Sequence, residues 1–393
     1  MEKGRLIVLS DHYLTFVKDQ IEAIAGEFSH VEVLVWYNPI AEISNVLPID
    51  RLRPFRKSAL VDTDDKPDNV TIHLLPVWYL PIDSEYKNLG ERYFRIAEKY
   101  IESHQISGDL IHAHFLWPNG WAAIRLKSKF NVPCVVTAHG YDIYDLPYRN
   151  DGWKVRIKKI LDNADVIITV SKSNLKHIQK IGTKTPAVLI PNGFRSDLFH
   201  HLDKMSCREK LGLPQNKKII VSIGNFVEEK GHRFLISAIS ELKKQRPEIF
   251  CCLIGRGHLK KKLTRQINKE NLGEWINLPG GISHTTIPIW LNACDVFVLP
   301  SLRESFGVVQ IEALGCGKPV VATRNGGSEE IITSSVGILV PPADSHALAE
   351  GIIHAIDASW DSSAIINYSS RFSMDHISQE ISTLYRDQVT RIS

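Results

Sequence analysis

Residues 295–323 read DVFVLPSLRESFGVVQIEALGCGKPVVAT, and this stretch indicates how the whole chain is organised. A buried strand is expected to end at Leu299, and a polar loop follows it. Apolar positions from Val308 to Leu314 predict a short helix that is closed by two glycines. The next apolar run, 319–322, follows at once. A strand, a helix and a second strand in this order are typical of a parallel sheet in an α/β protein.

The same alternation of short apolar runs and amphipathic stretches recurs along the chain. The runs are rich in Val and Ile, as strands buried on both faces of a sheet are. They include Leu6–Leu9, Val31–Val35, Leu110–Ala113, Cys134–Thr137, Val166–Val170, Val188–Ile190, Ile219–Ile223, Ile249–Ile254, Val296–Leu299, Pro319–Ala322 and Gly337–Val340. Because one sheet of this size is unusual, we expect two α/β domains, with a ligand bound in the cleft that their parallel sheets face.

Length and composition agree with this expectation. The chain has 393 residues, of which 44% are hydrophobic and 23% charged. At roughly 150 residues per domain, two or three domains are expected. Lys and Arg number 47 and Asp and Glu 44, so the net charge of +3 argues against wholesale nucleic-acid binding. No transmembrane span or signal peptide is expected. The six cysteines form no C-x-x-C pair, and this predicts reduced thiols in a cytosolic protein.

A turn signal, Pro191-Asn192-Gly193, marks the best break between the two domains. Near the end of the chain, apolar residues at helical spacing predict a last amphipathic helix that needs a surface to cover. The predicted boundaries are a first domain at 1–190, a hinge at 191–204, a second domain at 205–372 and a terminal helix at 373–393.

Two glutamates in residues 295–323 are the first candidates for ligand binding. Glu304 lies in the loop after the strand, and Glu312 lies in the helix. Between them, the amides of Phe306, Gly307 and Val308 should be free at the helix N-terminus, where they could bind a phosphate or a sugar hydroxyl. This arrangement suits a polyhydroxyl ligand that carries phosphate. The alternative is that Glu304 only caps the helix and Glu312 is a solvated side chain.

This pattern resembles the retaining nucleotide-sugar glycosyltransferases of family 4. Further matching motifs are IHAHF (111–115), TAHGYD (137–142), VSKSN (170–174), PNGFRSDLF (191–199), GNFVEEKGH (224–232), LIGRG (253–257), LPGGIS (278–283) and NGG (325–327). The resemblance implies a GT-B fold, in which two Rossmann-like domains face a central cleft and the C-terminal helix crosses back to the N-terminal domain. It also implies an acceptor-binding first domain and a donor-binding second domain.

The resemblance assigns expected roles to particular residues. Lys230 would contact the diphosphate of the donor, where negative charge develops on the departing group. Glu304 would bind hydroxyls of the transferred sugar, Glu312 would bind the ribose, and the three amides between them would hold sugar and phosphate. His139, which follows a strand, would lie near the reaction centre. His139, Lys230 and Glu304 are therefore the expected catalytic residues.

The chain departs from the family pattern at two places. The first strand–helix turn, LSDHYLTF (9–16), lacks the paired glycines that many relatives carry there. Asn225 stands where many relatives have an arginine, and a neutral amide cannot replace a guanidinium group on a diphosphate. We expect Arg256, after the next strand, to supply the missing cation, so that Asn225, Lys230 and Arg256 line one donor-binding region.

The predicted function is transfer of a hexose-type sugar from a nucleoside diphosphate donor to an acceptor hydroxyl, with retention of anomeric configuration. UDP and GDP are the expected nucleotides, no other cofactor and no metal are expected, and the acceptor would be a glycan, a lipid-linked sugar or a small molecule. The protein would act in glycan, glycolipid or polysaccharide biosynthesis. A non-catalytic sugar-nucleotide binding protein and a GT-B phosphorylase or epimerase are the alternatives.

Two features allow more than one interpretation. The basic residues of segment 153–161 could touch an anionic membrane, which would place this cytoplasmic protein at the inner membrane face. An ordinary amphipathic helix explains the same pattern. His112 and His114 should point to one side of a strand and could bind a metal, but no third ligand is evident, so a polar pair at a strand end is favoured.

Overall fold

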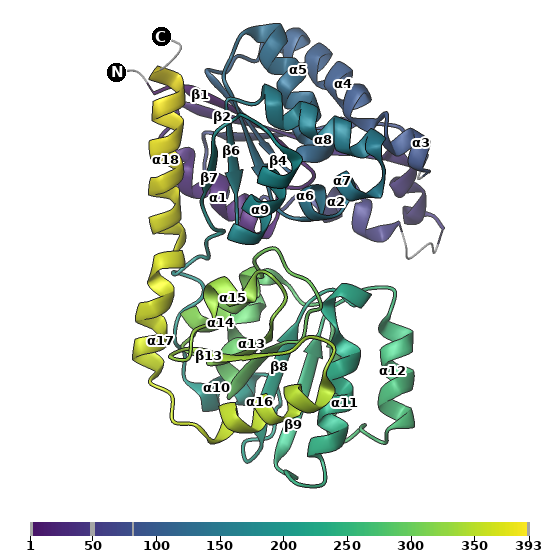
Figure 1. Ribbon diagram of the computed structural model, residues 1–393, viewed down its shortest axis with the longest axis vertical. Coiled ribbons are helices and arrows are strands. Elements are labelled where there is room, and N and C mark those ends of the chain that lie inside the picture. Colours follow the sequence, from purple (N-terminus) through teal and green to yellow (C-terminus); the bar gives the residue numbers. More distant parts are fainter. Residues whose placement is uncertain (1–2, 48–51, 81, 391–393) are drawn as a thin grey trace. The chain divides into compact units, whose positions relative to one another are not determined.

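The computed structural model describes residues 3–47, 52–80 and 82–390, with the backbone alone for residues 54, 389 and 390. The chain divides into two compact units, Met1–Asn192 together with Ile377–Ser393, and Gly193–His376. In each unit a parallel sheet is flanked by helices (Figure 1). The predicted domain ranges include residues 1–2, 48–51, 81 and 391–393, which lie outside the described residues.

The first unit contains, among its described residues, a sheet of seven strands in the order β3-β2-β1-β4-β5-β6-β7, every neighbour parallel. Its strands are β1 (Arg5–Ser10), β2 (His30–Tyr37), β3 (Val70–Pro76), β4 (Leu110–His114), β5 (Cys134–Ala138), β6 (Val166–Thr169) and β7 (Ala187–Leu189). Its helices are α1 (Thr15–Ala25), α2 (Lys57–Leu60), α3 (Asp83–Tyr86), α4 (Leu89–Ser103), α5 (Trp121–Phe130), α6 (Tyr141–Tyr144), α7 (Leu146–Arg149), α8 (Asp151–Asn163) and α9 (Lys172–Ile181). The strands β4, β5 and β6 are buried along their whole length, and apart from His112, His114 and two threonines their residues are apolar.

The second unit is built in the same way. Over the described range its sheet has six parallel strands in the order β10-β9-β8-β11-β12-β13. The strands are β8 (Lys218–Ile223), β9 (Ile249–Ile254), β10 (Ile276–Gly280), β11 (Val296–Leu299), β12 (Val320–Thr323) and β13 (Gly337–Val340). The helices are α10 (Lys204–Lys210), α11 (His232–Leu242), α12 (Lys260–Lys269), α13 (Ile287–Ala293), α14 (Val308–Gly315), α15 (Ser328–Ile331), α16 (Ser345–Asp357) and α17 (Ser362–Ser369). The predicted strand–helix–strand unit is β11, α14 and β12.

The terminal helix α18 (Met374–Thr390) packs on the first unit from Ile377 onward, as expected for the GT-B fold. Ile377, Ile381 and Tyr385 are buried in one apolar cluster with residues of β1 and α1. The Tyr385 hydroxyl also lies 2.5 Å from Nδ1 of the buried His112 on β4. The last helix therefore completes the core of the first unit.

Two strands, β3 and β10, were not predicted from the sequence. Both lie at an edge of their sheet, and most of their residues are only partly buried. Half-buried edge strands need no continuous apolar run, so the pattern that marks the central strands is weak there.

Within the described ranges no helix is long and apolar enough to cross a membrane. The basic segment forms α8, whose apolar face is buried through Trp153, Ile157, Ile160 and Leu161, so the amphipathic-helix interpretation explains its pattern. All six cysteines are free and buried, as predicted.

Candidate active site

The central contact of the site in the second unit joins Lys230 and Glu304. The Lys230 ammonium lies 2.5 Å from Oε1 of Glu304, which also accepts a hydrogen bond from the Ser301 hydroxyl at 2.7 Å. The Glu304 side chain is 9% exposed and that of Lys230 27% exposed. The pair is therefore desolvated on the Glu304 side and open on the Lys230 side, where an anionic ligand can reach the ammonium.

The backbone explains why these two residues meet, although they are far apart in sequence. Lys230 ends the short helix η4 (Glu228–Lys230) after β8, and Glu304 lies in the loop after β11. The amide of Leu302 donates to the Glu229 carbonyl at 2.7 Å, which ties the two loops together. Gly231, at φ 63°, packs directly against the Pro300 carbonyl, where a Cβ would clash. Only glycine allows this approach without strain.

The N-terminus of α14 presents unbonded amides. Within the described residues no acceptor bonds the backbone amides of Phe306, Gly307 or Val308. The buried Gln310 side chain donates to the Phe306 carbonyl at 3.0 Å and so fixes this turn. Gly307 takes the left-handed conformation, φ 84°. Free amides and the positive end of the helix dipole make this terminus suited to an anion or to hydroxyl oxygens.

Glu312 is buried in α14 and is paired with a histidine that the sequence did not single out. Its Oε1 lies 2.9 Å from Nε2 of His284, and Glu312 is only 5% exposed. His284 begins the short helix η5 (His284–Thr286), directly after the motif LPGGIS. The position after that motif was the only sequence signal that could have identified it.

The alternative interpretation of the two glutamates is wrong on both counts. No side chain caps α14, whose N-cap is Gly307, because the Glu304 carboxylate is bound by Lys230 and Ser301 instead. Glu312 is buried and not solvated. Both carboxylates are thus held in fixed positions near the same helix.

Asn225 and Arg256 lie on adjacent loops after β8 and β9. The Phe226 amide donates to the Arg256 carbonyl at 2.7 Å, which joins the loops. Both side chains are exposed. The Arg256 guanidinium donates to the Gly281 carbonyl at 3.2 Å, and no carboxylate in the described part of the chain pairs with it. Among the described residues no hydrogen bond or ion pair joins either side chain to Lys230.

His139 lies in the first unit, at the end of β5. It is 7% exposed, and its Nε2 lies 3.0 Å from Nδ1 of His114, at the end of β4. Burial lowers the pKa of both imidazoles well below the usual value, and the proximity of other histidines lowers it further. Both rings are therefore neutral, and a hydrogen bond between them has the proton on one of the two facing nitrogens. Sequence reasoning placed His114 only in a polar pair with His112.

The neighbouring His112 is satisfied without a metal. Its Nε2 lies 2.7 Å from the Thr137 hydroxyl, and its Nδ1 faces Tyr385. Nowhere in the described ranges do three or more His, Cys, Asp or Glu side chains gather in a way that could hold a metal ion.

Family models match both halves of the chain. Residues 55–198 match Glycosyltransferase Family 4, and residues 203–372 match Glycosyl transferases group 1. An uncharacterized glycosyltransferase of Methanocaldococcus jannaschii is 33% identical over 265 residues, which cover 67% of this chain and 69% of the relative.

Solved structures agree in fold. Sucrose-phosphate synthase from Thermosynechococcus elongatus superposes with a TM-score of 0.79 at 24% identity, covering 98% of this chain and 100% of that one. Anabaena HepE in complex with UDP-glucose superposes with a TM-score of 0.75 at 20% identity, with 98% and 100% covered. The chain therefore belongs to glycosyltransferase family 4 and is a glycosyltransferase with the GT-B fold.

Proposed function

We propose that this glycosyltransferase moves a hexose from a UDP- or GDP-sugar to an acceptor hydroxyl, with retention at the anomeric carbon, in glycan, glycolipid or polysaccharide biosynthesis. One observation carries the proposal. A lysine, two fixed carboxylates and a set of unbonded amides surround the N-terminus of one helix, at the carboxyl edge of the second sheet. A sugar nucleotide carries the complementary groups, namely a diphosphate and two sets of hydroxyls.

Each group in the site has a matching task. Lys230 would contact the diphosphate as negative charge develops on it, the α14 amides would bind its oxygens or those of the sugar, and Glu304 would accept from the sugar hydroxyls. Glu312, held by His284, would accept from the two ribose hydroxyls. These interactions fix the donor, and fixed orientation supplies a large part of catalysis in group transfer. His139 of the first unit would contact the sugar near the reacting carbon.

The chemical step is a front-face displacement. The bond from the anomeric carbon to the diphosphate oxygen breaks, and the acceptor oxygen forms its bond to the same face of that carbon. The acceptor hydroxyl proton passes to the departing diphosphate oxygen, so the products are the glycoside and the nucleoside diphosphate. No protein nucleophile is needed for this step. The complex of Anabaena HepE with UDP-glucose supports UDP as the nucleotide.

Calorimetric titration with UDP, GDP and ADP tests the donor site. Lys230→Ala and Glu312→Gln should each weaken the preferred diphosphate by about ten- to hundredfold, because each removes a charge-assisted hydrogen bond. The chain offers matched controls. Lys129 is paired with Glu98 and Glu102 on the surface of the first unit, and Glu241 is paired with His346. Lys129→Ala and Glu241→Gln should bind as the unmodified protein does.

Binding of no diphosphate, or equal losses in the site and control variants, would contradict the donor site. Once the nucleotide is known, proton NMR of the first product formed from the α-linked donor reports the anomeric configuration. An α-linked product supports retention, and a β-linked product excludes it. Incubation of the donor alone should yield neither an epimer nor a sugar phosphate. A cytoplasmic location and contact with the inner membrane face stay predictions from the sequence.

A further inference from the structure

The exposed apolar side chains of the first unit gather in two segments, one after β2 and one after β3. Among the described residues, twelve large apolar or aromatic side chains are exposed, and seven of them lie between residues 43 and 82. Single exposed apolar residues are normal in proteins, but a group of them marks a surface that binds a partner. We call these seven residues the apolar surface. They are Ile43, Val46, Leu47, Phe55, Trp78, Leu80 and Ile82.

The two segments lie side by side. The strands that precede them, β2 and β3, pair in parallel, and β3 is the edge strand of the sheet. The Asn38 side-chain amide donates to the Tyr79 carbonyl at 2.7 Å, and its oxygen accepts from the Ile40 amide at 3.1 Å. Asn38 therefore caps the short helix η1 (Pro39–Asn45) and also holds the second segment beside it. The apolar surface thus belongs to one region, at the carboxyl ends of β2 and β3.

The described part of the first segment is folded. The Arg56 guanidinium, directly after the short helix η2 (Arg53–Phe55), donates to the Ser44 hydroxyl at 2.7 Å and also to the Ser44 carbonyl. The Lys57 amide donates to Oε1 of Glu42 at 2.8 Å. These contacts join η1 to η2 and to the start of α2. The exposed apolar side chains therefore project from a backbone that is held in place.

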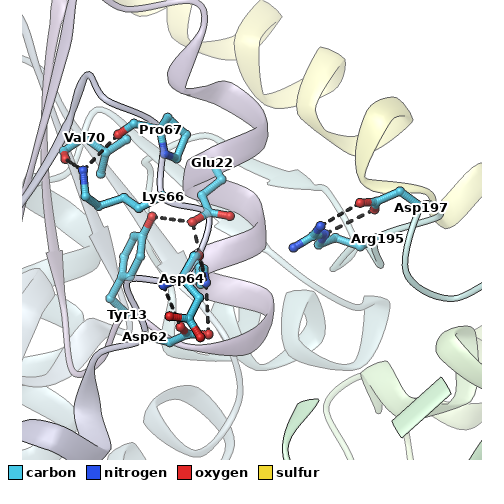
Figure 2. A network of polar contacts seen from close by, with 10 residues as sticks. Tyr13, Glu22, Asp62, Asp64, Lys66, Pro67, Val70, Arg195 and Asp197 are labelled. Carbon is cyan, nitrogen blue, oxygen red and sulfur yellow. Dashed lines mark hydrogen bonds and ion pairs between the residues drawn. The ribbon is translucent and has the colours of Figure 1, made fainter. Parts of the chain in front are cut away.

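A buried lysine fixes the end of the first segment on α1. The Lys18 ammonium lies 3.0 Å from Oδ2 of Asp62 and donates to the Asp64 carbonyl at 2.6 Å. The Tyr13 amide donates to the Leu60 carbonyl at 2.8 Å. Figure 2 shows Asp62 and Asp64 gathered beside Tyr13. Because breaking a buried ion pair is costly, the segment is anchored at this end, as it is at Asn38.

The charges beside the apolar surface favour an anionic partner. Arg53 and Lys57 are exposed, and Arg56 is half-buried. Among the described residues from 39 to 61, Glu42 is the only acidic one, so three cations stand against one carboxylate. A surface with exposed apolar side chains and a positive border is complementary to a bilayer of anionic lipids, which offers apolar chains and negative headgroups. Trp78 supplies a ring of the kind that is enriched at this boundary.

The acidic residues nearby do not cancel this charge. On α3, both acidic side chains form ion pairs with cations, at 2.5 and 2.6 Å. The acidic stretch 62–68 runs along α1 toward the end of that helix, where the Asn69 side chain donates to the Ala25 carbonyl at 2.8 Å. This stretch therefore leads away from the carboxyl ends of β2 and β3.

We propose that the apolar surface docks on a membrane that contains anionic lipids, with Val46, Leu47 and Trp78 entering the boundary between headgroups and acyl chains. Arg53 and Lys57 would contact lipid phosphates. This surface is distinct from α8, to which the sequence pointed. Docking does not depend on the proposed function. Its consequence does: docking would place the carboxyl edge of the first sheet at the bilayer, which favours an acceptor carried by a lipid.

Sedimentation of the whole protein with vesicles tests the proposal. Vesicles of equal parts phosphatidylglycerol and phosphatidylcholine should bind it about tenfold or more tightly than phosphatidylcholine alone, because each cation near an anionic surface contributes about fivefold. Val46, the most exposed of the seven at 86%, loses apolar contact in Val46→Ser, and binding should weaken about fivefold, as it should in Arg53→Gln. Val188→Ser and Lys184→Gln are the controls. Both exposed residues lie at β7, the opposite edge of the sheet, and neither change should affect binding.

Trp78 reports which surface enters the bilayer. All eight tryptophans lie in the described ranges, and of these only Trp78 is exposed. Lipids brominated on their acyl chains quench the fluorescence of a tryptophan that reaches them. The anionic brominated vesicles should quench the unmodified protein, and most of this quenching should be lost in Trp78→Phe.

Three results would overturn the proposal: no binding to the anionic vesicles, equal losses in Val46→Ser and Val188→Ser, or quenching that persists in Trp78→Phe. Self-association in analytical ultracentrifugation that Val46→Ser abolishes, without vesicle binding, would instead assign the apolar surface to contact between copies of the chain. UDP titration of the same samples tests the donor site separately, so a failure of docking is told apart from a failure of the proposed function.

Discussion

Substitution of Gly231 by alanine tests how the second unit brings Lys230 to Glu304. Gly231 follows Lys230 directly, has φ 63°, and packs against the Pro300 carbonyl so closely that a Cβ would lie nearer than 3.0 Å to its oxygen. Alanine would have to push the loop after β8 away from the end of β11. Because Lys230 and Glu304 lie on these two loops, their ion pair should open as a result.

Gly212 supplies the matched control for the size of the effect. Its φ of 62° is nearly the same, but no atom lies within 4 Å of a Cβ built on it. Gly212→Ala should therefore cost only the conformational penalty, about 1 kcal/mol. Gly231→Ala adds a backbone shift in a packed region, about 2 kcal/mol more. The difference corresponds to roughly 30-fold in the local opening equilibrium.

Hydrogen exchange followed by mass spectrometry resolves the two variants by region. Peptides that cover β8 and β11 should exchange about 30-fold faster in Gly231→Ala than in Gly212→Ala. The affinity for the preferred diphosphate should fall in Gly231→Ala alone, because Lys230 loses its position. If the amides of β11 exchange at the same rate in both variants and both bind the diphosphate with the same affinity, the close approach of Gly231 to Pro300 does not position Lys230.

Three further substitutions have expected outcomes. Burial raises the pKa of Asp11 from 3.8 to about 6, so the folded protein favours the protonated carboxyl and loses this stabilisation as the pH rises through about 6. The neutral amide of Asp11→Asn avoids that loss. In urea titrations the substitution should therefore raise the free energy of unfolding by about 1–2 kcal/mol at pH 7.5 and leave it unchanged at pH 4. Tyr385→Phe leaves buried Nδ1 of His112 without its partner and should cost about 1–3 kcal/mol, seen as faster exchange in α18. Arg256→Ala should lower donor affinity and turnover in steady-state assays, and unchanged values would remove Arg256 from the site.

The interior strands could be predicted from the sequence because burial on both faces demands continuous apolar runs. The strands β1, β8 and β9 show this pattern clearly. The edge strands β3 and β10 could not be found in this way, because water reaches part of their surface and polar residues are tolerated. Register and strand order also depend on pairing between distant segments, which no local pattern records.

In the candidate site, too, local sequence patterns reveal some residues, whereas others can be found only in the folded chain. Glu304 and Glu312 stand out because they lie in one strand–loop–helix motif. The contacts that hold them come from other loops, Lys230 after β8 and His284 after β10, and only the folded sheet brings those loops to one edge.

The ion pair of Lys230 with Glu304 has a consequence for the missing arginine at Asn225. A lysine already paired with a carboxylate brings little net charge to a diphosphate, because the glutamate cancels it. The α14 amides supply only partial charges, so a second cation is needed to balance the donor. Arg256 meets that need at small cost. Its loop is bonded to the loop of Asn225, and its guanidinium gives up only one exposed hydrogen bond, to the Gly281 carbonyl. We therefore expect Arg256 to turn toward the diphosphate when the donor binds, and Lys230 to be shared between Glu304 and the leaving group.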